Sequence, residues 1–138
     1  MGNVTTSKIN FENVQEATKT TSIMLINTLS RESQDCLIRG TIPADKEESL
    51  INHCLKKNKQ VTIFVYGKNN NDETIVKKHK QFVDLGFKNV YVYPGGLFEW
   101  LLMQDIYGED NFPTTSKQLD LLRYKPSSNL SSSLVVYR

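Results

Sequence analysis

The residues of this chain that most suggest chemistry lie between positions 61 and 72, VTIFVYGKNNND. The β-branched and aromatic residues 61–66 predict a buried strand, and a helical pattern begins near Asp72. A strand that leads through a short loop into a helix surrounds the loop with unpaired backbone N–H groups, an arrangement that binds anions. Glycine and asparagine readily adopt the left-handed backbone that such a loop needs. The sequence therefore predicts an anion-binding loop formed by Gly67, Lys68, Asn69, Asn70, Asn71 and Asp72.

This loop lacks a reactive atom. No Cys, Ser, Thr or His lies between Gly67 and Asp72. The Asp72 carboxylate can also accept the N–H groups at the start of the following helix, in competition with an external anion. We therefore expect only weak anion binding, in the millimolar range and on the order of 4 kcal/mol.

Strands and helices alternate along the part of the chain that surrounds this loop. Apolar runs at residues 23–26, 61–66 and 89–93 predict buried strands, and residues 36–42 predict a further short strand or extended segment. Helical periodicity marks residues 45–58, 73–85 and 97–106, with Gly86 as a natural helix stop. The alternation predicts an α/β fold: a mainly parallel central sheet of four to five strands, with helices on both faces.

Length and composition narrow the class of protein. A chain of 138 residues is expected to form one domain, and a net charge of +2 without a basic aromatic cluster gives no reason to expect nucleic-acid binding. The apolar runs are far shorter than the ~20 residues of a membrane span. The two cysteines do not form a disulfide framework, which favours an intracellular, cytoplasmic location. His79 has no ligands at metal-binding spacing, so we expect neither metal nor cofactor.

The two ends of the chain differ from its centre. The first residues, MGNVTTSK, fit the N-myristoylation pattern through Gly2 and Thr6, although the match can also arise by chance. One acyl chain would give marginal, reversible association with a membrane surface. The Ser-rich end, KPSSNLSSSLVVYR, predicts a partly disordered extension. The expected organisation is an N-terminal segment at 1–20, a domain at 21–115 and an extension at 116–138.

Several segments resemble the rhodanese-like domain family and follow that family's order. Residues 23–28, IMLINT, resemble its first core strand, with Asn27 where the family has Asp. Residues 40–44, GTIPA, resemble its Gly-His-Ile-Pro-Gly-Ala segment, with Thr41 where His is usual. Residues 65–67, VYG, match the Val-Tyr-Cys that opens the active-site loop, and Gly67 takes the place of the nucleophile. The closing pattern is matched by LGF at 85–87, VYV at 90–92, the glycine pair at 95–96 and Trp100.

The resemblance implies a fold without the family's chemistry. Active members carry sulfur as a persulfide on a cysteine thiolate in this loop, and related phosphatases of the same fold depend on the same cysteine. Glycine cannot supply a thiolate. Lys68, which stands where an Arg is often found, can still attract an anion. We therefore expect a binding, regulatory or structural module with an unknown protein partner rather than an enzyme. The alternative is a sulfurtransferase-type enzyme whose nucleophile has moved to Cys36 or Cys54, which rapid thiol alkylation would reveal.

Overall fold

The computed structural model describes residues 7–127, so Gly2 and the Ser-rich end at 128–138 lie outside the described residues. Its centre is a four-stranded, all-parallel sheet in the order β2-β1-β3-β4. The strands are β1 (Ile23–Asn27), β2 (Thr41–Ile42), β3 (Thr62–Tyr66) and β4 (Asn89–Tyr93). The three strands predicted at 23–26, 61–66 and 89–93 are thus neighbours, and the α/β prediction is confirmed.

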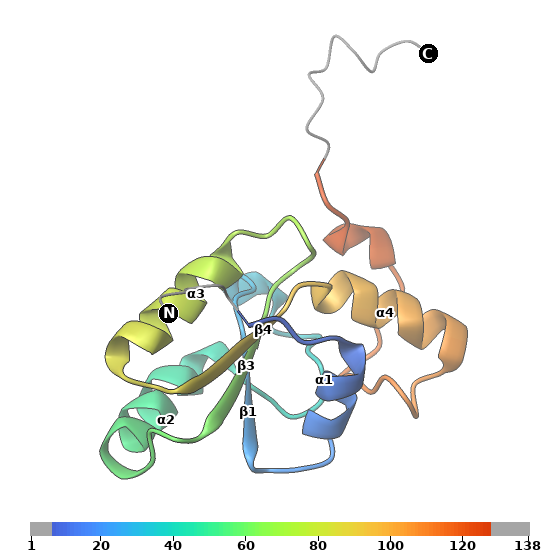
Figure 1. Cartoon of the computed structure of the whole chain (residues 1–138). Helices are drawn as coiled ribbons and strands as arrows, with labels where there is room; N and C mark the ends of the chain where they lie inside the picture. The colour runs from blue at the N-terminus through green and yellow to red at the C-terminus, as the bar shows by residue number, and fades with distance from the viewer. Residues whose placement is uncertain (1–6, 128–138) are drawn as a thin grey trace, which may run out of the picture.

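Helices cover both faces of the sheet, as Figure 1 shows. On one face lie α1 (Phe11–Ala17) and α4 (Gly96–Tyr107), and on the other α2 (Ala44–Lys57) and α3 (Thr74–Leu85). Each strand supplies both cores because successive side chains point to opposite faces. In β3, Phe64 and Tyr66 pack toward α1 and α4, whereas Ile63 and Val65 pack toward α2 and α3. This double burial explains why the strands read as continuous apolar runs.

The short strand predicted within residues 36–42 is present, but it is confined to the last two residues of the segment. Only Thr41–Ile42 form a strand, β2, and the positive φ of 91° at Gly40 turns the chain just before it. Ile38 instead makes an antiparallel bridge with Thr114, far along the chain. The apolar character of this segment therefore reflects burial beneath the C-terminal residues rather than a long strand.

Both flanking regions contact the central sheet. Lys8 forms a parallel bridge with Val92, which places a short extended segment at the free edge of β4. After α4, the chain returns along the domain and ends its described part with a 3₁₀ helix, η2 (Leu121–Tyr124). Tyr124 is buried in the same core as α1 and α4. The domain boundaries at residues 20 and 115 stay predictions, but ordered contacts extend beyond both.

Within residues 7–127, no helix has both the length and the apolar character required to cross a membrane.

Candidate functional site

The loop between β3 and α3 lies at the carboxyl end of the sheet, and the Asp72 carboxylate fills it. One carboxylate oxygen, Oδ2, accepts the backbone N–H of Lys68 at 2.8 Å. The other, Oδ1, accepts the N–H of Thr74 at 3.0 Å and its hydroxyl at 2.5 Å. Asp72 therefore closes the loop and caps α3, a role that acidic residues commonly take at helix starts. Two N–H groups that could meet an anion already have an internal partner.

Gly67 is enclosed by this carboxylate and by Thr28, which follows β1. A Cβ atom at position 67 would lie 2.5 Å from Asp72 Oδ2 and 2.8 Å from Thr28 Oγ1, distances that real Cβ atoms essentially never show. The backbone of Gly67 is not in the left-handed region, so the restriction is one of space rather than backbone strain. The position that the resemblance assigns to the nucleophile is therefore crowded by the ends of two neighbouring side chains, which would have to shift to admit a side chain there.

The other side of the loop is fixed to the start of α4. The N–H of Leu97 donates to the carbonyl oxygen of Gly67 at 2.9 Å, and that of Phe98 to the carbonyl of Lys68 at 3.0 Å. Gly96 has a φ of 67°, and a Cβ there would come within 2.7 Å of the Gly67 carbonyl oxygen. The loop carbonyls thus satisfy N–H groups at the start of α4, which would otherwise have no partner in the helix.

Asn69 links the loop to the C-terminal residues. It is buried, and its side-chain Nδ2 donates to the carbonyl oxygen of Tyr124 at 2.9 Å, while its Oδ1 accepts the N–H of Asn71 at 2.9 Å. Sequence reasoning placed Asn69 in a polar loop and Tyr124 outside the domain, so it missed this contact. The side chains of Lys68, Asn70 and Asn71 are exposed at the surface.

The two departures from the family pattern outside the loop are built into hydrogen-bond networks. Asn27 exchanges hydrogen bonds with Gln34: its Nδ2 donates to Gln34 Oε1 at 3.1 Å, and its Oδ1 accepts from Gln34 Nε2 at 2.8 Å. The buried Thr41 hydroxyl donates to the Ile38 carbonyl at 2.6 Å and lies 2.7 Å from the Tyr66 hydroxyl. Burial raises the pKa of Tyr66 above its ordinary value. Both positions therefore have structural partners of their own.

The two cysteines lie in different surroundings. Cys36 is fully buried, its Sγ donates to the Ser116 carbonyl at 3.4 Å, and burial raises the pKa of its thiol. Cys54 is half-buried on α2, 3.6 Å from the sulfur of Met24. A thiol that is buried and lacks a cationic partner is a poor nucleophile. Burial therefore disfavours Cys36 as a relocated nucleophile, whereas the half-buried Cys54 lines an open pocket together with Lys19.

A polar groove of about 380 Å³ lies next to Thr28, between the starts of α2 and α3. Lys78 on α3 and Glu47 on α2 form an ion pair across it, with 2.7 Å between nitrogen and oxygen. The side chains that line it offer amide, hydroxyl and charged groups and no thiol: Asn27, Thr28, Leu29, Ala44, Glu47, Thr74, Lys77, Lys78 and Gln81. Thr28 lines this groove, and its hydroxyl also lies next to Gly67, but none of residues 67–72 lines the groove.

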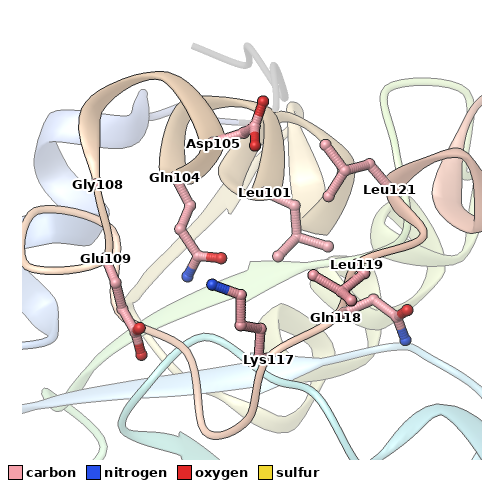
Figure 2. A pocket seen from close by; sticks show the side chains of 9 residues that line it. All are labelled: Leu101, Gln104, Asp105, Gly108, Glu109, Lys117, Gln118, Leu119 and Leu121. Carbon is pink, nitrogen blue, oxygen red and sulfur yellow. The ribbon is translucent and has the colours of Figure 1, made fainter.

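A second pocket, of about 250 Å³, lies between α4 and residues 117–121, as Figure 2 shows. The Lys117 side chain reaches across it toward Gln104, whose amide already donates to Phe112 and Thr114. The pocket contains none of the loop residues. Among residues 7–127, no group of three or more His, Cys, Asp or Glu is arranged to hold a metal ion.

Comparisons with known proteins agree with this geometry. A family model described as a rhodanese-like domain matches residues 17–103. Among solved structures, the Alr3790 protein from Anabaena sp. is 19% identical, with a TM-score of 0.57, and the match covers 83% of this chain and 84% of that one. The BH2092 protein from Bacillus halodurans is also 19% identical, with a TM-score of 0.57 over 72% of this chain and 74% of that one.

A third similar structure is the single-domain sulfurtransferase RDL2 from Saccharomyces cerevisiae. It is 16% identical, with a TM-score of 0.55, and the match covers 82% of this chain and all of that one, 100%. At these identities the likeness concerns the fold. A search of curated proteins found no match at the required significance.

Proposed function

This chain belongs to the rhodanese-like domain family, and we propose that it is a member that no longer transfers sulfur and acts as a binding module. The observation that carries this proposal is the Asp72 carboxylate, which lies where a side chain at position 67 would have to be. Sulfur transfer through the loop requires a covalent persulfide, and Gly67 has no side chain that could form one. Backbone N–H groups stabilise a charge, but they cannot carry the sulfur.

The charge of Asp72 supports the same proposal. A carboxylate within contact distance of position 67 would oppose both a thiolate and an anionic sulfur donor, because like charges at short range disfavour ionisation. A cysteine introduced at 67 would therefore meet a steric and an electrostatic obstacle together. Removing Asp72 relieves both.

The assay is cyanolysis with thiosulfate or mercaptopyruvate as donor. We expect no activity above the no-enzyme control for the wild type, for Cys36→Ser and for Cys54→Ser. Gly67→Cys should remain nearly inactive, whereas Gly67→Cys combined with Asp72→Ala should show some transfer activity. Robust wild-type turnover that disappears in either Cys→Ser variant would establish the relocated nucleophile and refute the proposal.

The groove between α2 and α3 is the surface that we assign to an unknown protein partner. It combines hydrogen-bonding groups with the ammonium group of Lys77, whose side chain is exposed. We expect Lys77→Glu together with Gln81→Ala to abolish capture of that partner from the native source. The matched pair Lys117→Glu and Gln118→Ala, on the second pocket, should leave capture unchanged. Equal loss in both pairs would exclude the groove as the binding surface.

We also propose that the loop binds an anion such as phosphate weakly. Because Asp72 already accepts the N–H of Lys68, phosphate must compete with it, and we expect binding only in the millimolar range. In Asp72→Ala the affinity should rise. Amide chemical shifts of residues 68–71 during a phosphate titration measure this, and constant shifts in both proteins would refute an anion site.

We also propose that Gly2 is N-myristoylated, on the basis of the MGNVTTSK pattern. The protein would then associate partly and reversibly with membranes, and this association should disappear in Gly2→Ala. The intact mass of the natively expressed protein tests the modification directly, since a free Gly2 or a retained Met1 would exclude it.

A further inference from the structure

Four lysines gather at the amino end of the sheet, opposite the loop: Lys56, Lys57, Lys59 and Lys88. We call them the lysine cluster. We propose that the lysine cluster docks the domain on a membrane surface rich in anionic lipid, where it supplies the second attachment that a single acyl chain needs. This inference rests on the proposed acylation of Gly2, and the experiment below separates the two.

The cluster is assembled from two connections that are distant in sequence. Lys57 is the last residue of α2, Lys59 follows it, and Lys88 precedes β4. The backbone N–H of Lys88 donates to the carbonyl oxygen of Lys59 at 3.3 Å, which holds the two connections together. They lie side by side where α2 and α3 end (Figure 1). All four side chains are exposed.

Internal charge pairing does not account for these lysines. The ion pairs among residues 7–127 use Lys78 and Lys80, and none uses a member of the cluster. The nearest acid on α3, Asp84, is paired with Lys80 at 2.8 Å. The helix dipole favours cations at the end of α2, but it gives no reason for Lys59 and Lys88. Four like charges with little compensation form a positive surface that suits an anionic partner.

The N-terminal segment enters the structure on the side of this surface. The Ser7 carbonyl accepts the N–H of Val92 at 2.9 Å, and the N–H of Ile9 donates to the carbonyl of Val92 at 2.9 Å. Because this segment runs parallel to β4, the chain enters it from the direction of Asn89, at the amino end. The distance along β4 from Val92 back to Asn89 is about 10 Å. The residues between Gly2 and Ser7 can span up to about 17 Å, so an acyl chain on Gly2 can reach the same bilayer as the lysines.

The energetics require such a second attachment. A single myristoyl chain binds bilayers with an association constant of only about 10⁴ M⁻¹. Each lysine held close to an anionic surface strengthens binding by roughly fivefold. Four lysines should therefore raise binding by about two orders of magnitude or more. This increase should fall with salt, because the screening length is about 10 Å at 0.1 M ionic strength.

The experiment uses the full chain co-expressed with an N-myristoyltransferase, with acylation checked by intact mass. Binding is measured by flotation with phosphatidylcholine vesicles, with and without phosphatidylserine, at low and high salt. The cluster variant replaces Lys56, Lys57, Lys59 and Lys88 by Gln. The matched control replaces Arg31, Lys46, Lys117 and Lys125 by Gln, the same change in net charge on exposed residues outside the lysine cluster. Thermal unfolding of both variants confirms that they fold.

We expect the cluster variant to lose about a hundredfold in binding to vesicles that contain phosphatidylserine, and the control to stay within about threefold of the wild type. Gly2→Ala should bind these vesicles weakly at low salt, with the same ranking of variants. That ranking tests the lysine cluster even if intact mass shows that Gly2 is not acylated. Equal losses in both variants would overturn the proposal. Tighter binding to a duplex RNA than to the vesicles at the same salt would overturn it in favour of a nucleic-acid surface.

Discussion

A methyl group added at Gly67 tests the packing of the loop directly. In Gly67→Ala, Cβ would lie 2.5 Å from Asp72 Oδ2, so the carboxylate must move. The move breaks its hydrogen bond with the Lys68 N–H and weakens those with Thr74. Hydrogen bonds to a charged group contribute about 1.5–3 kcal/mol, and the half-exposed position of Asp72 favours the lower value. The Gly→Ala change also stabilises the protein by about 0.5 kcal/mol, because alanine lowers the conformational entropy of the unfolded chain. This gain applies here because the backbone of Gly67 is not left-handed, so alanine can adopt it. We expect a net loss of about 1–2 kcal/mol in the free energy of unfolding.

The same substitution should be almost neutral when Asp72 is absent. In Asp72→Ala the hydrogen bonds have already been lost, and the space beside Gly67 is open on that side. The Thr28 hydroxyl must still rotate away, which breaks its 2.6 Å contact with the Thr74 hydroxyl, an effect of about 1 kcal/mol that the Gly→Ala gain partly offsets. The two substitutions should therefore show a coupling energy of about 1 kcal/mol or more.

Urea unfolding of the wild type, the two single variants and the double variant measures this coupling energy. An equal slope of the transition in all four proteins confirms two-state unfolding. The matched control is the cycle of Gly67→Ala with Asp84→Ala, because Asp84 lies on the exposed side of α3. That pair should be additive within about 0.5 kcal/mol. Additivity of Gly67→Ala and Asp72→Ala as well would refute the conclusion that Asp72 fills the place of a side chain at position 67.

Three further predictions concern buried polar groups. In a Cys54→Ser background, Cys36 should react with iodoacetamide only at the rate of unfolding, and rapid labelling at neutral pH would contradict its burial. Tyr124→Phe should retain or raise the free energy of unfolding, because the Tyr124 hydroxyl has no hydrogen-bond partner among the described residues. Asn69→Ala should lower the free energy of unfolding by about 1–2 kcal/mol, because it removes the hydrogen bond to the Tyr124 carbonyl. Urea unfolding midpoints compare the two variants. Burial raises the pKa of Tyr66 and Tyr93 above the unfolded value of about 10, so stability is fully present below that pH and falls as the pH rises. The tyrosinate absorbance of Tyr66, measured as the difference between the wild type and Tyr66→Phe, should therefore appear together with unfolding, and gradual titration of Tyr66 in the folded protein would contradict this.

The sheet could be predicted from sequence because its strands are buried on both faces. Continuous runs such as residues 61–66 leave little alternative to a strand, and Gly86 marks a helix end through a conformation that glycine favours. The strand within residues 36–42 covers only Thr41–Ile42, for a reason outside the local sequence. The apolar side chains of this segment are buried by residues 112–116, which lie far along the chain, and periodicity carries no information about such contacts.

The loop was predicted in outline and not in its contacts. The order strand, glycine, helix located it, and the ability of Asp72 to accept N–H groups was foreseeable from its place before a helix. The contacts of Gly67 with Thr28 and of Asn69 with Tyr124 were not, because they join segments that only the folded chain brings together. The lysine cluster is partly of this kind: residues 56–59, KKNK, are adjacent in the sequence, whereas Lys88 joins them only in the folded chain.

The contacts between the loop and α4 explain how this loop can keep its shape without a nucleophile. The carbonyl groups of Gly67 and Lys68 accept the first N–H groups of α4, and Gly96 packs against the same carbonyl of Gly67. A loop of different shape would leave these helix donors without partners, at about 1–3 kcal/mol for each buried group. The fold therefore requires this shape of the loop, because the loop carbonyls accept the first N–H groups of α4. Under the proposed non-catalytic function, this structural requirement stays in force and accounts for the glycine pair at 95–96 and the short polar loop. A Cβ at position 67 would lie 2.5 Å from Asp72 Oδ2, and the Asp72 carboxylate accepts the N–H groups of Lys68 and Thr74.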